Sequence, residues 1–149
     1  MQLNEFLEGE LILPFLEADN KTAVLEELLL PLGQKWPQLD LENAKTVLLE
    51  REGLGSTGIG DGIAIPHGKL EVLEEVAVVV GRSQQGVDFN ALDQQPCHIF
   101  FLVMAPEHVA GMHLRILATI SRTLKDEVFR RSFLQAEGKK DLWHLLQAS

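Results

Sequence analysis

Residues 60–68 have the composition of a segment that presents a reactive imidazole. They read Gly-Asp-Gly-Ile-Ala-Ile-Pro-His-Gly, so a short apolar strand ends in a proline and delivers His67 between small residues. Pro66 fixes its own φ and biases Ile65 toward extended geometry, while Gly68 has no Cβ and lets a bulky partner approach the ring. The imidazole pKa lies near neutrality, so a nitrogen lone pair is available as a nucleophile. These residues alone fit a nucleophilic His67 and an ordinary turn histidine equally well.

Arg51 is a second candidate, because it is a charged residue on an apolar stripe. It lies three, four and seven residues after Leu48, Val47 and Ala44, and the helical repeat therefore places it on their inward face. A cation there could complement the carboxyl end of the helix, or extend its stem so that the charged head reaches water. It could equally bind an anion.

His113 is the third candidate. It precedes Leu117 and Ile120 by one and two helical turns, which predicts that it faces the sheet with them. A histidine on an apolar face is more often a satisfied core residue than a working one. The remaining histidines have no comparable setting and are interpreted as structural or solvent-exposed: His98, His108 and His144.

Other chemistries find little support. His67, His108 and His113 could converge on a metal ion, but the five-residue spacing of the last two does not put them on one helical face, and no His-Glu-x-x-His pattern occurs. We therefore expect no metal. The glycine-rich residues 55–62 lack the Gly-Lys-Ser/Thr of a phosphate loop, and no Gly-x-Ser-x-Gly elbow is present. The lone Cys97 excludes an intrachain disulfide and is expected to be a small buried filler.

The charge balance limits the partners. With 13 basic and 22 acidic residues among 149, the chain has a net charge of −9, which opposes binding to nucleic acid or anionic lipid and favours a basic protein partner. The longest apolar runs, 76–80 and 99–105, are too short to span a bilayer. We expect a soluble, cytoplasmic protein with no nucleic-acid partner and no membrane insertion.

The helices that would position these groups follow from caps and periodicity. Asp19 or Asn20 can cap a helix that ends near Gly33, and Asp40 can cap a second helix with Gly53 at its carboxyl end. Three more helices are expected toward the end of the chain, at 109–124, from a cap at residue 126 to 133, and at 139–147.

The strands complete the predicted architecture. Residues 76–80 and 99–103 are continuous β-branched and aromatic runs, which are typical of central strands covered on both faces, and residues 86–90 fit a short edge strand or a loop. The sequence therefore predicts an α/β fold for residues 1–149: a single-domain layered sandwich, with a central mixed β-sheet of about five strands and helices on both faces.

Residues 49–68 as a whole resemble a known signature; they read Leu-Glu-Arg-Glu-Gly-Leu-Gly-Ser-Thr-Gly-Ile-Gly-Asp-Gly-Ile-Ala-Ile-Pro-His-Gly. Further matches follow at 93–96 (Asp-Gln-Gln-Pro), at 99–106 (Ile-Phe-Phe-Leu-Val-Met-Ala-Pro) and at 113–121 (His-Leu-Arg-Ile-Leu-Ala-Thr-Ile-Ser). In this order they are similar to the type-2 IIA (EIIA) domain of the bacterial phosphotransferase system, the fructose, mannitol and nitrogen-regulatory family. The resemblance covers nearly the whole chain.

This resemblance implies that His67 is phosphorylated on Nε2, and that Arg51 and His113 belong to the same site. The donor would be phospho-HPr, itself charged from phosphoenolpyruvate through Enzyme I, and no cofactor is implied. Arg51 could donate a bidentate pair of hydrogen bonds to phosphate oxygens, and Ser56 or Thr57 could add others. Gly68 and the glycines before it would permit close approach.

Three roles are compatible with the resemblance. No IIB or IIC module follows in the chain, which favours a regulatory, nitrogen-type EIIA whose phosphorylation state selects its target proteins. The alternative is the EIIA component of a fructose- or mannitol-type sugar transporter, which passes phosphate to a separate IIB protein. The second alternative is a phosphate-independent protein-binding module. Residues 109–112 depart from the more polar lead-in common before the second histidine, and Gly111 could delay the start of its helix.

Overall fold

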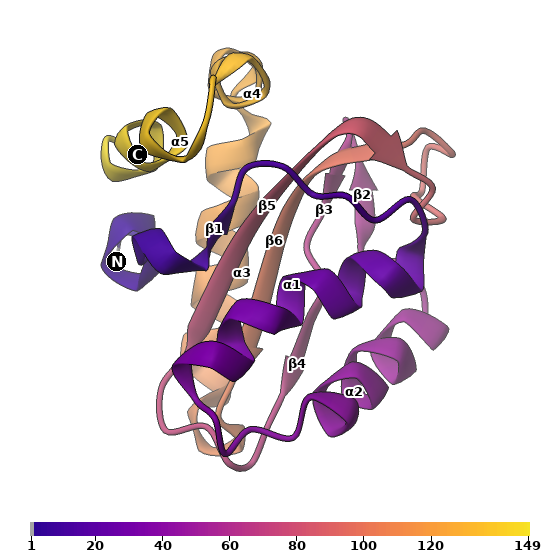
Figure 1. The fold of residues 1–149 in the computed structure, drawn as a ribbon, viewed down its shortest axis with the longest axis vertical. Helices are drawn as coiled ribbons and strands as arrows, with labels where there is room; N and C mark the ends of the chain where they lie inside the picture. The colour runs from indigo at the N-terminus through magenta and orange to yellow at the C-terminus, as the bar shows by residue number, and fades with distance from the viewer. Residues whose placement is uncertain (1) are drawn as a thin grey trace.

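The structure is a computed structural model that describes residues 2–149, the side chain of Ala110 excepted. Its centre is a mixed β-sheet in the strand order β1-β5-β6-β3-β2, with β4 also paired to β6 (Figure 1). β5 and β6 are antiparallel, β1 is parallel to β5, and both β3 and β4 are parallel to β6. The predicted mixed sheet is confirmed, with six strands: β1 (Ile12–Leu13), β2 (Gly58–Gly60), β3 (Ile63–Ala64), β4 (His67–Lys69), β5 (Ala77–Val87) and β6 (Cys97–Ala105).

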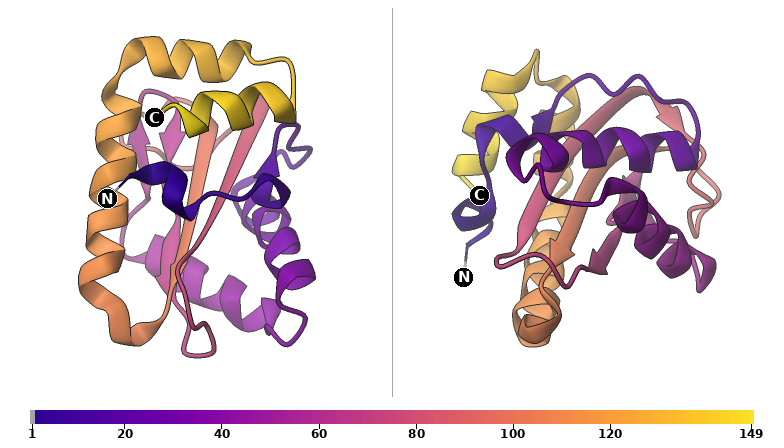
Figure 2. Two further views of the ribbon diagram at one scale, coloured as in Figure 1. Left: turned by 90° about the vertical axis from the view of Figure 1, so that its left-hand side faces the viewer. Right: turned by 60° about the horizontal axis from the view of Figure 1, so that its bottom comes forward.

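Helices cover both faces of this sheet, as predicted. α1 and α2 pack on one face and α3 runs along the other, with α4 and α5 at the end of α3 (Figure 1; Figure 2). Within residues 2–149, no helix has the length and apolar character needed to cross a membrane. The α-helices are α1 (Lys21–Lys35), α2 (Leu41–Gly53), α3 (Ala110–Lys125), α4 (Glu127–Gln135) and α5 (Lys139–Gln147), and the 3-10 turns are η1 (Leu3–Phe6), η2 (Gly9–Leu11) and η3 (Glu107–Val109).

The sheet separates two apolar layers. Side chains alternate along the central strands, so Val79 and Leu102 pack beneath α1 and α2, while Val78 and Val103 pack beneath α3. All four are fully buried, which explains why β5 and β6 begin as continuous apolar runs instead of alternating polar and apolar residues.

Side-chain caps begin three helices at the residues that the sequence predicts. The Oδ1 atoms of Asn20 and Asp40 accept hydrogen bonds from the backbone N–H three residues later, at 2.9 and 3.1 Å, and Asp126 caps α4 in the same way. α2 ends at Gly53, also as predicted. The first glycine with a positive φ after the helix is Gly55, at +151°.

The structure refines three details of this prediction. α1 continues past Gly33 to Lys35, because Gly33 serves packing: a Cβ there would lie 2.8 Å from Cδ1 of Leu41. α3 already includes Gly111, so this glycine does not delay the helix. Of the two alternatives for residues 86–90, a separate edge strand is wrong, since β5 extends to Val87 through further pairing with β6, and the loop is found at residues 89–90.

Arg82 on β5 ties the C-terminal helices to the sheet. Its side chain is 1% exposed; Nε donates to the carbonyl of Pro14 at 3.1 Å, and Nη1 donates to the carbonyls of Phe133, at 3.0 Å, and Ala136. Burial lowers the pKa of Arg82. One guanidinium therefore joins the segment after β1 and the carboxyl end of α4 to a central strand.

Close packing at Gly68 sets the position of α2 against β4. A Cβ at Gly68 would lie 2.7 Å from Cγ1 of Val47, closer than real Cβ contacts come. α2 therefore approaches β4 more closely than a residue with a side chain at position 68 would allow. Because Val47 lies one helical turn before Arg51, this contact also fixes where Arg51 stands relative to the edge of the sheet.

We expect Gly68→Ala to lower the free energy of unfolding by about 1–3 kcal/mol, because the added methyl group overlaps Val47. Urea unfolding measures this loss. The double variant Gly68→Ala/Val47→Ala should be more stable than the sum of the two single losses predicts, since truncating Val47 makes room for the methyl group. Strictly additive losses would show that the two groups do not compete for space.

Candidate functional site

His67 is the first residue of β4, where it pairs with Val103 of β6. From the sequence we expected His67 to follow a strand. It lies within a strand instead, because pairing with β6 resumes at Pro66, whose carbonyl accepts a hydrogen bond from Val103 N–H at 3.0 Å. Paired residues point to the same face, so His67 lies on the α3 side, like Val103. Among the described strands, β4 pairs with β6 alone, and the half-buried ring therefore stands at an edge of the sheet.

A backbone hydrogen bond fixes the tautomer of His67. Its Nδ1 lies 2.8 Å from the carbonyl oxygen of Ile65, which can only accept, so Nδ1 carries the proton and Nε2 holds a lone pair in the neutral ring. Burial lowers the pKa of His67 and the positive charge of Arg51 lowers it further, while the Ile65 hydrogen bond and the charge of Glu52 raise it. The net effect favours a neutral imidazole with a free Nε2.

His113 of α3 stands beside His67. The two ring centroids are 5.4 Å apart, and the ring planes meet edge to face at 78°. The His113 side chain is 5% exposed, and burial, with the charges of His67 and Lys69, lowers its pKa to about 4. Its Nδ1 is buried and has no hydrogen-bond partner among residues 2–149. A core histidine normally has both polar atoms satisfied, so His113 differs from an ordinary buried histidine in this respect.

Arg51 lies in the last turn of α2, half-buried as its place on the apolar stripe predicts. Its Nη1 donates to the carbonyl of Gly55 at 2.9 Å, which complements the carboxyl end of the helix. Its charge also acts on His67, so the two predicted roles of Arg51 are compatible. A guanidinium has five N–H donors, and the bond to Gly55 uses one of them.

The hydroxyls of Ser56 and Thr57 already donate to other groups of the protein. Ser56 Oγ donates to the carbonyl of Phe89 at 2.7 Å, and Thr57 Oγ1 donates to the carboxylate of Glu52. Each hydroxyl has a single proton to give, so neither has one left for phosphate in this conformation. Phosphate binding by Ser56, Thr57 or Gly68 stays a prediction; the close approach seen at Gly68 is that of Val47.

Glu52 is a residue near the site that the sequence analysis did not single out. Its side chain is buried; it accepts from Thr57 N–H at 3.0 Å and from Thr57 Oγ1, and it pairs with Lys21 Nζ at 2.9 Å. It thereby holds the loop after α2 against the start of α1. One signal was available: Glu52 lies four and eight residues after Leu48 and Ala44, so it is a carboxylate on the core stripe of α2.

The other groups weighed in the sequence lie apart from this cluster. Nδ1 of His98 lies 2.8 Å from the carbonyl of Ser83 within the sheet, and His108 and His144 are exposed on η3 and α5. Cys97 is fully buried, as predicted, and burial raises the pKa of its thiol to about 11. In the part of the chain that the structure describes, no three His, Cys, Asp or Glu side chains gather as metal ligands would.

Known proteins resemble this chain in sequence and in structure. A nitrogen regulatory protein of Bradyrhizobium diazoefficiens is 35% identical over 149 residues, which cover 98% of this chain and 95% of that protein. The fructose-specific EIIABC component of Bacillus subtilis is 37% identical over 139 residues, which cover 93% of this chain but 22% of that protein's length. The crystal structure of the nitrogen regulatory protein IIA-Ntr from Neisseria meningitidis matches with a TM-score of 0.89 at 28% identity, covering 97% of this chain and 98% of that one.

A family model gives the same result over almost the full sequence. Residues 5–149 match the model described as phosphoenolpyruvate-dependent sugar phosphotransferase system, EIIA 2. The fold and the relatives agree with that match. The chain therefore belongs to the type-2 EIIA family of the phosphoenolpyruvate-dependent phosphotransferase system.

Proposed function

We propose that residues 1–149 act as one phosphoryl-carrier unit, in which Nε2 of His67 accepts phosphate from a phosphohistidine of an HPr-type carrier protein. One observation carries this proposal: the Nδ1–H of His67 is held by the Ile65 carbonyl, which leaves Nε2 as the free lone pair of a neutral ring at a sheet edge. A nucleophile needs an unprotonated, accessible atom of this kind.

The transfer balances without moving a proton at His67. Nε2 attacks phosphorus and forms the new N–P bond, while the N–P bond of the donor histidine breaks and its electron pair returns to the donor ring. Nδ1 keeps its proton and its bond to Ile65 throughout, so the ring needs no reorientation. The transferred group brings negative charge, and catalysis then depends on alignment and charge stabilisation.

Positive groups whose charge acts on the two histidines would favour that negative charge, although the chain as a whole carries −9. Arg51 acts electrostatically on His67, and Lys69, two residues after His67, acts on His113. Arg51 has N–H groups to spare for phosphate oxygens. His113, whose ring lies edge to face with that of His67, would donate a ring N–H once a phosphoryl group stands on His67.

Exposed leucines near these groups suit a protein donor. Leu54 is 86% exposed three residues after Arg51, and Leu114 is 68% exposed directly after His113. Apolar side chains in the open, next to a reactive group, are typical of a surface that a partner protein covers. An acidic chain with such a surface favours a basic phosphocarrier of the HPr type.

For the role downstream, we propose a regulatory, nitrogen-type EIIA whose phosphorylation state selects its target proteins. The match to the nitrogen regulatory protein of Bradyrhizobium diazoefficiens along nearly the full length of both chains supports this role. The match to the fructose-specific EIIABC component supports the alternative, in which phosphate passes to a IIB protein in sugar transport. EIIA domains relay phosphate in both settings.

The test of the carrier proposal is label transfer from radioactive phosphoenolpyruvate through purified Enzyme I and an HPr-type protein. We expect acid-labile label on the wild type and none on His67→Ala, because only His67 offers the nucleophilic Nε2 described above. His144→Ala, which removes an exposed histidine on α5, should be labelled like the wild type.

A folded wild type that takes no label from several HPr-type donors would contradict the carrier proposal and favour a phosphate-independent binding module. With labelled protein in hand, a fructose-type IIB protein can be added. Rapid loss of label to IIB would favour the sugar-transport role, whereas retention of the label would favour the regulatory role.

Replacing Arg51 should slow phosphorylation without preventing folding. We expect Arg51→Met to reduce the initial labelling rate by about 100-fold, because a charged donor to the transferred group is lost. Arg51→Lys keeps the charge but not the bidentate geometry, so its labelling rate should lie between those of the wild type and Arg51→Met. Arg131→Met removes a surface arginine on α4 and serves as the control. Equal rates for both methionine variants would exclude a role for Arg51 in transfer.

Phosphorylation of His67 should raise the pKa of His113. In the free protein that pKa is about 4, because burial and the charges of His67 and Lys69 oppose protonation. A phosphoryl anion nearby favours the protonated, doubly donating ring, so the titration should move upward. NMR titration of the His113 ring protons, with and without phosphate on His67, measures the shift, and an unmoved titration would place the phosphoryl group out of reach of His113.

A further inference from the structure

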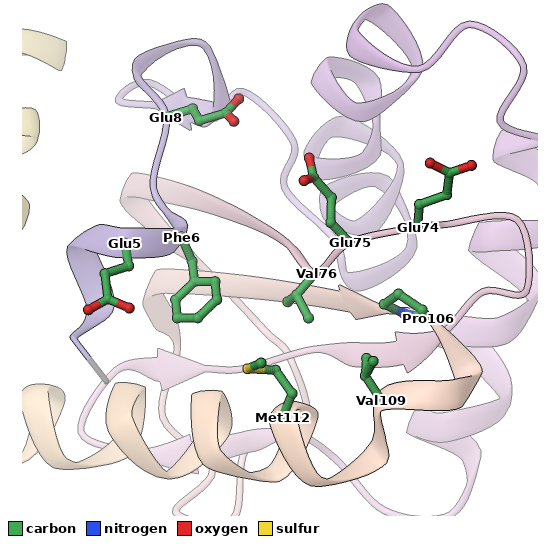
Figure 3. Close-up of a pocket in the computed structure, with 9 residues that line it drawn as sticks. All are labelled: Glu5, Phe6, Glu8, Glu74, Glu75, Val76, Pro106, Val109 and Met112. Carbon is green, nitrogen blue, oxygen red and sulfur yellow. The ribbon is translucent and has the colours of Figure 1, made fainter.

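A second surface feature lies on the α3 side, formed by η1, the residues before β5 and the first turn of α3 (Figure 3). It is a pocket of about 350 Å³ whose apolar lining consists of Phe6, Val76, Pro106, Val109 and Met112. None of the groups placed around His67 lines it. Met112, 39% exposed, directly precedes His113, so one turn of α3 borders both features.

Acidic side chains lie beside this apolar lining, on the two segments that face α3. Figure 3 shows Glu5 and Glu8 on the N-terminal segment, and Glu74 and Glu75 on the segment that leads to Val76. Glu8 pairs with Lys35, which lowers the pKa of Glu8. Within residues 2–149, Glu5, Glu74 and Glu75 have no ion-pair partner, and the pocket has no basic lining residue. The pocket, called the acidic pocket below, therefore combines apolar area with uncompensated negative charge.

We propose that the acidic pocket is a docking site for a cationic segment of a partner protein. An apolar side chain of that segment packs between Phe6, Val76 and Met112, and a flanking lysine or arginine lies near Glu74 and Glu75. This interaction is separate from phosphoryl transfer and does not depend on the carrier role. The partner could bind whether or not His67 is a nucleophile.

Charge decides among the possible occupants. A second copy of this chain would bring the same three unpaired glutamates, Glu5, Glu74 and Glu75, against each other in a symmetric contact, and like charges at an interface are unfavourable. Nucleic acid and anionic membranes are repelled for the same reason. A volume of about 350 Å³ holds an anchoring side chain with its neighbours, and the acidic residues around it complement a basic flank.

The experiment is an NMR titration of the isotope-labelled full chain with a blocked pentapeptide of alternating arginine and leucine. We expect shifts of the backbone amides of Val76, Val109 and Met112 that saturate and that weaken as salt is raised. A peptide with glutamate in place of arginine, and one with serine in place of leucine, should each produce much smaller shifts. The first lacks the positive charge that complements the glutamates, and the second lacks the apolar side chain that fills the pocket.

Two matched double variants distinguish binding at the acidic pocket from non-specific attraction between the peptide and an acidic protein. Glu74→Gln/Glu75→Gln should weaken binding of the arginine–leucine peptide by about tenfold. Glu127→Gln/Glu137→Gln makes the same change in net charge, from −9 to −7, at exposed residues around α4, and should leave binding nearly unchanged. Neither pair belongs to the site at His67, so phosphorylation of His67 should be unaffected in both.

Four results would overturn the proposal. Equal weakening by both double variants, or equal binding of the serine peptide, would reduce the interaction to non-specific attraction between opposite charges. Shifts centred on His67 and His113 would assign the peptide to the other site. Concentration-dependent shifts of Val76 and Met112 without any peptide would identify a second copy of this chain as the occupant.

Discussion

The parallel register of β4 on β6 determines how the site is assembled. Side chains alternate along a strand, so the pairing of His67 with Val103 turns the imidazole toward α3, and the pairing of Gly68 with Met104 turns the glycine toward α2. A slip of one residue would exchange the two faces, aim the ring into the packing beneath α2 and separate it from His113. Three residues of strand thus bring together contributions from two helices that lie on opposite sides of the sheet.

The electrostatics around His67 follow from that assembly. Burial keeps both imidazoles neutral, and Arg51 and Lys69 add positive charge at the edge of the sheet. Glu52, the carboxylate whose charge opposes this effect, is engaged by Lys21 and Thr57. Nδ1 of His113 has no hydrogen-bond partner within residues 2–149, and a group that bonded to it would add to the stability of the folded state.

Much of this could be predicted from the sequence, because the signals were local. Helix caps such as Asn20 and Asp40 can be recognised from about four consecutive residues, and the apolar stripe that includes Arg51 from two helical turns. Contacts between distant segments left no such signal. β1, a two-residue strand, owes its existence to pairing with β5. The pKa of His113 is lowered by burial and by His67, which lies 46 positions earlier in the chain. The edge-to-face contact of the two histidine rings joins the same two positions. The hydroxyl partners of Ser56 and Thr57 likewise became visible only when the loop was folded.

Within residues 2–149, the anchoring of the C-terminal helices by Arg82 uses no acidic partner. The groups that accept from its guanidinium are backbone carbonyls, so this connection does not depend on a carboxylate. The loop beside His67 is held in a different way, by the carboxylate of Glu52, which pairs with Lys21 and accepts from Thr57. The two ends of the molecule are therefore connected to the sheet by different chemistry: one guanidinium on backbone carbonyls at α4, and one carboxylate shared by a lysine and a threonine beside His67.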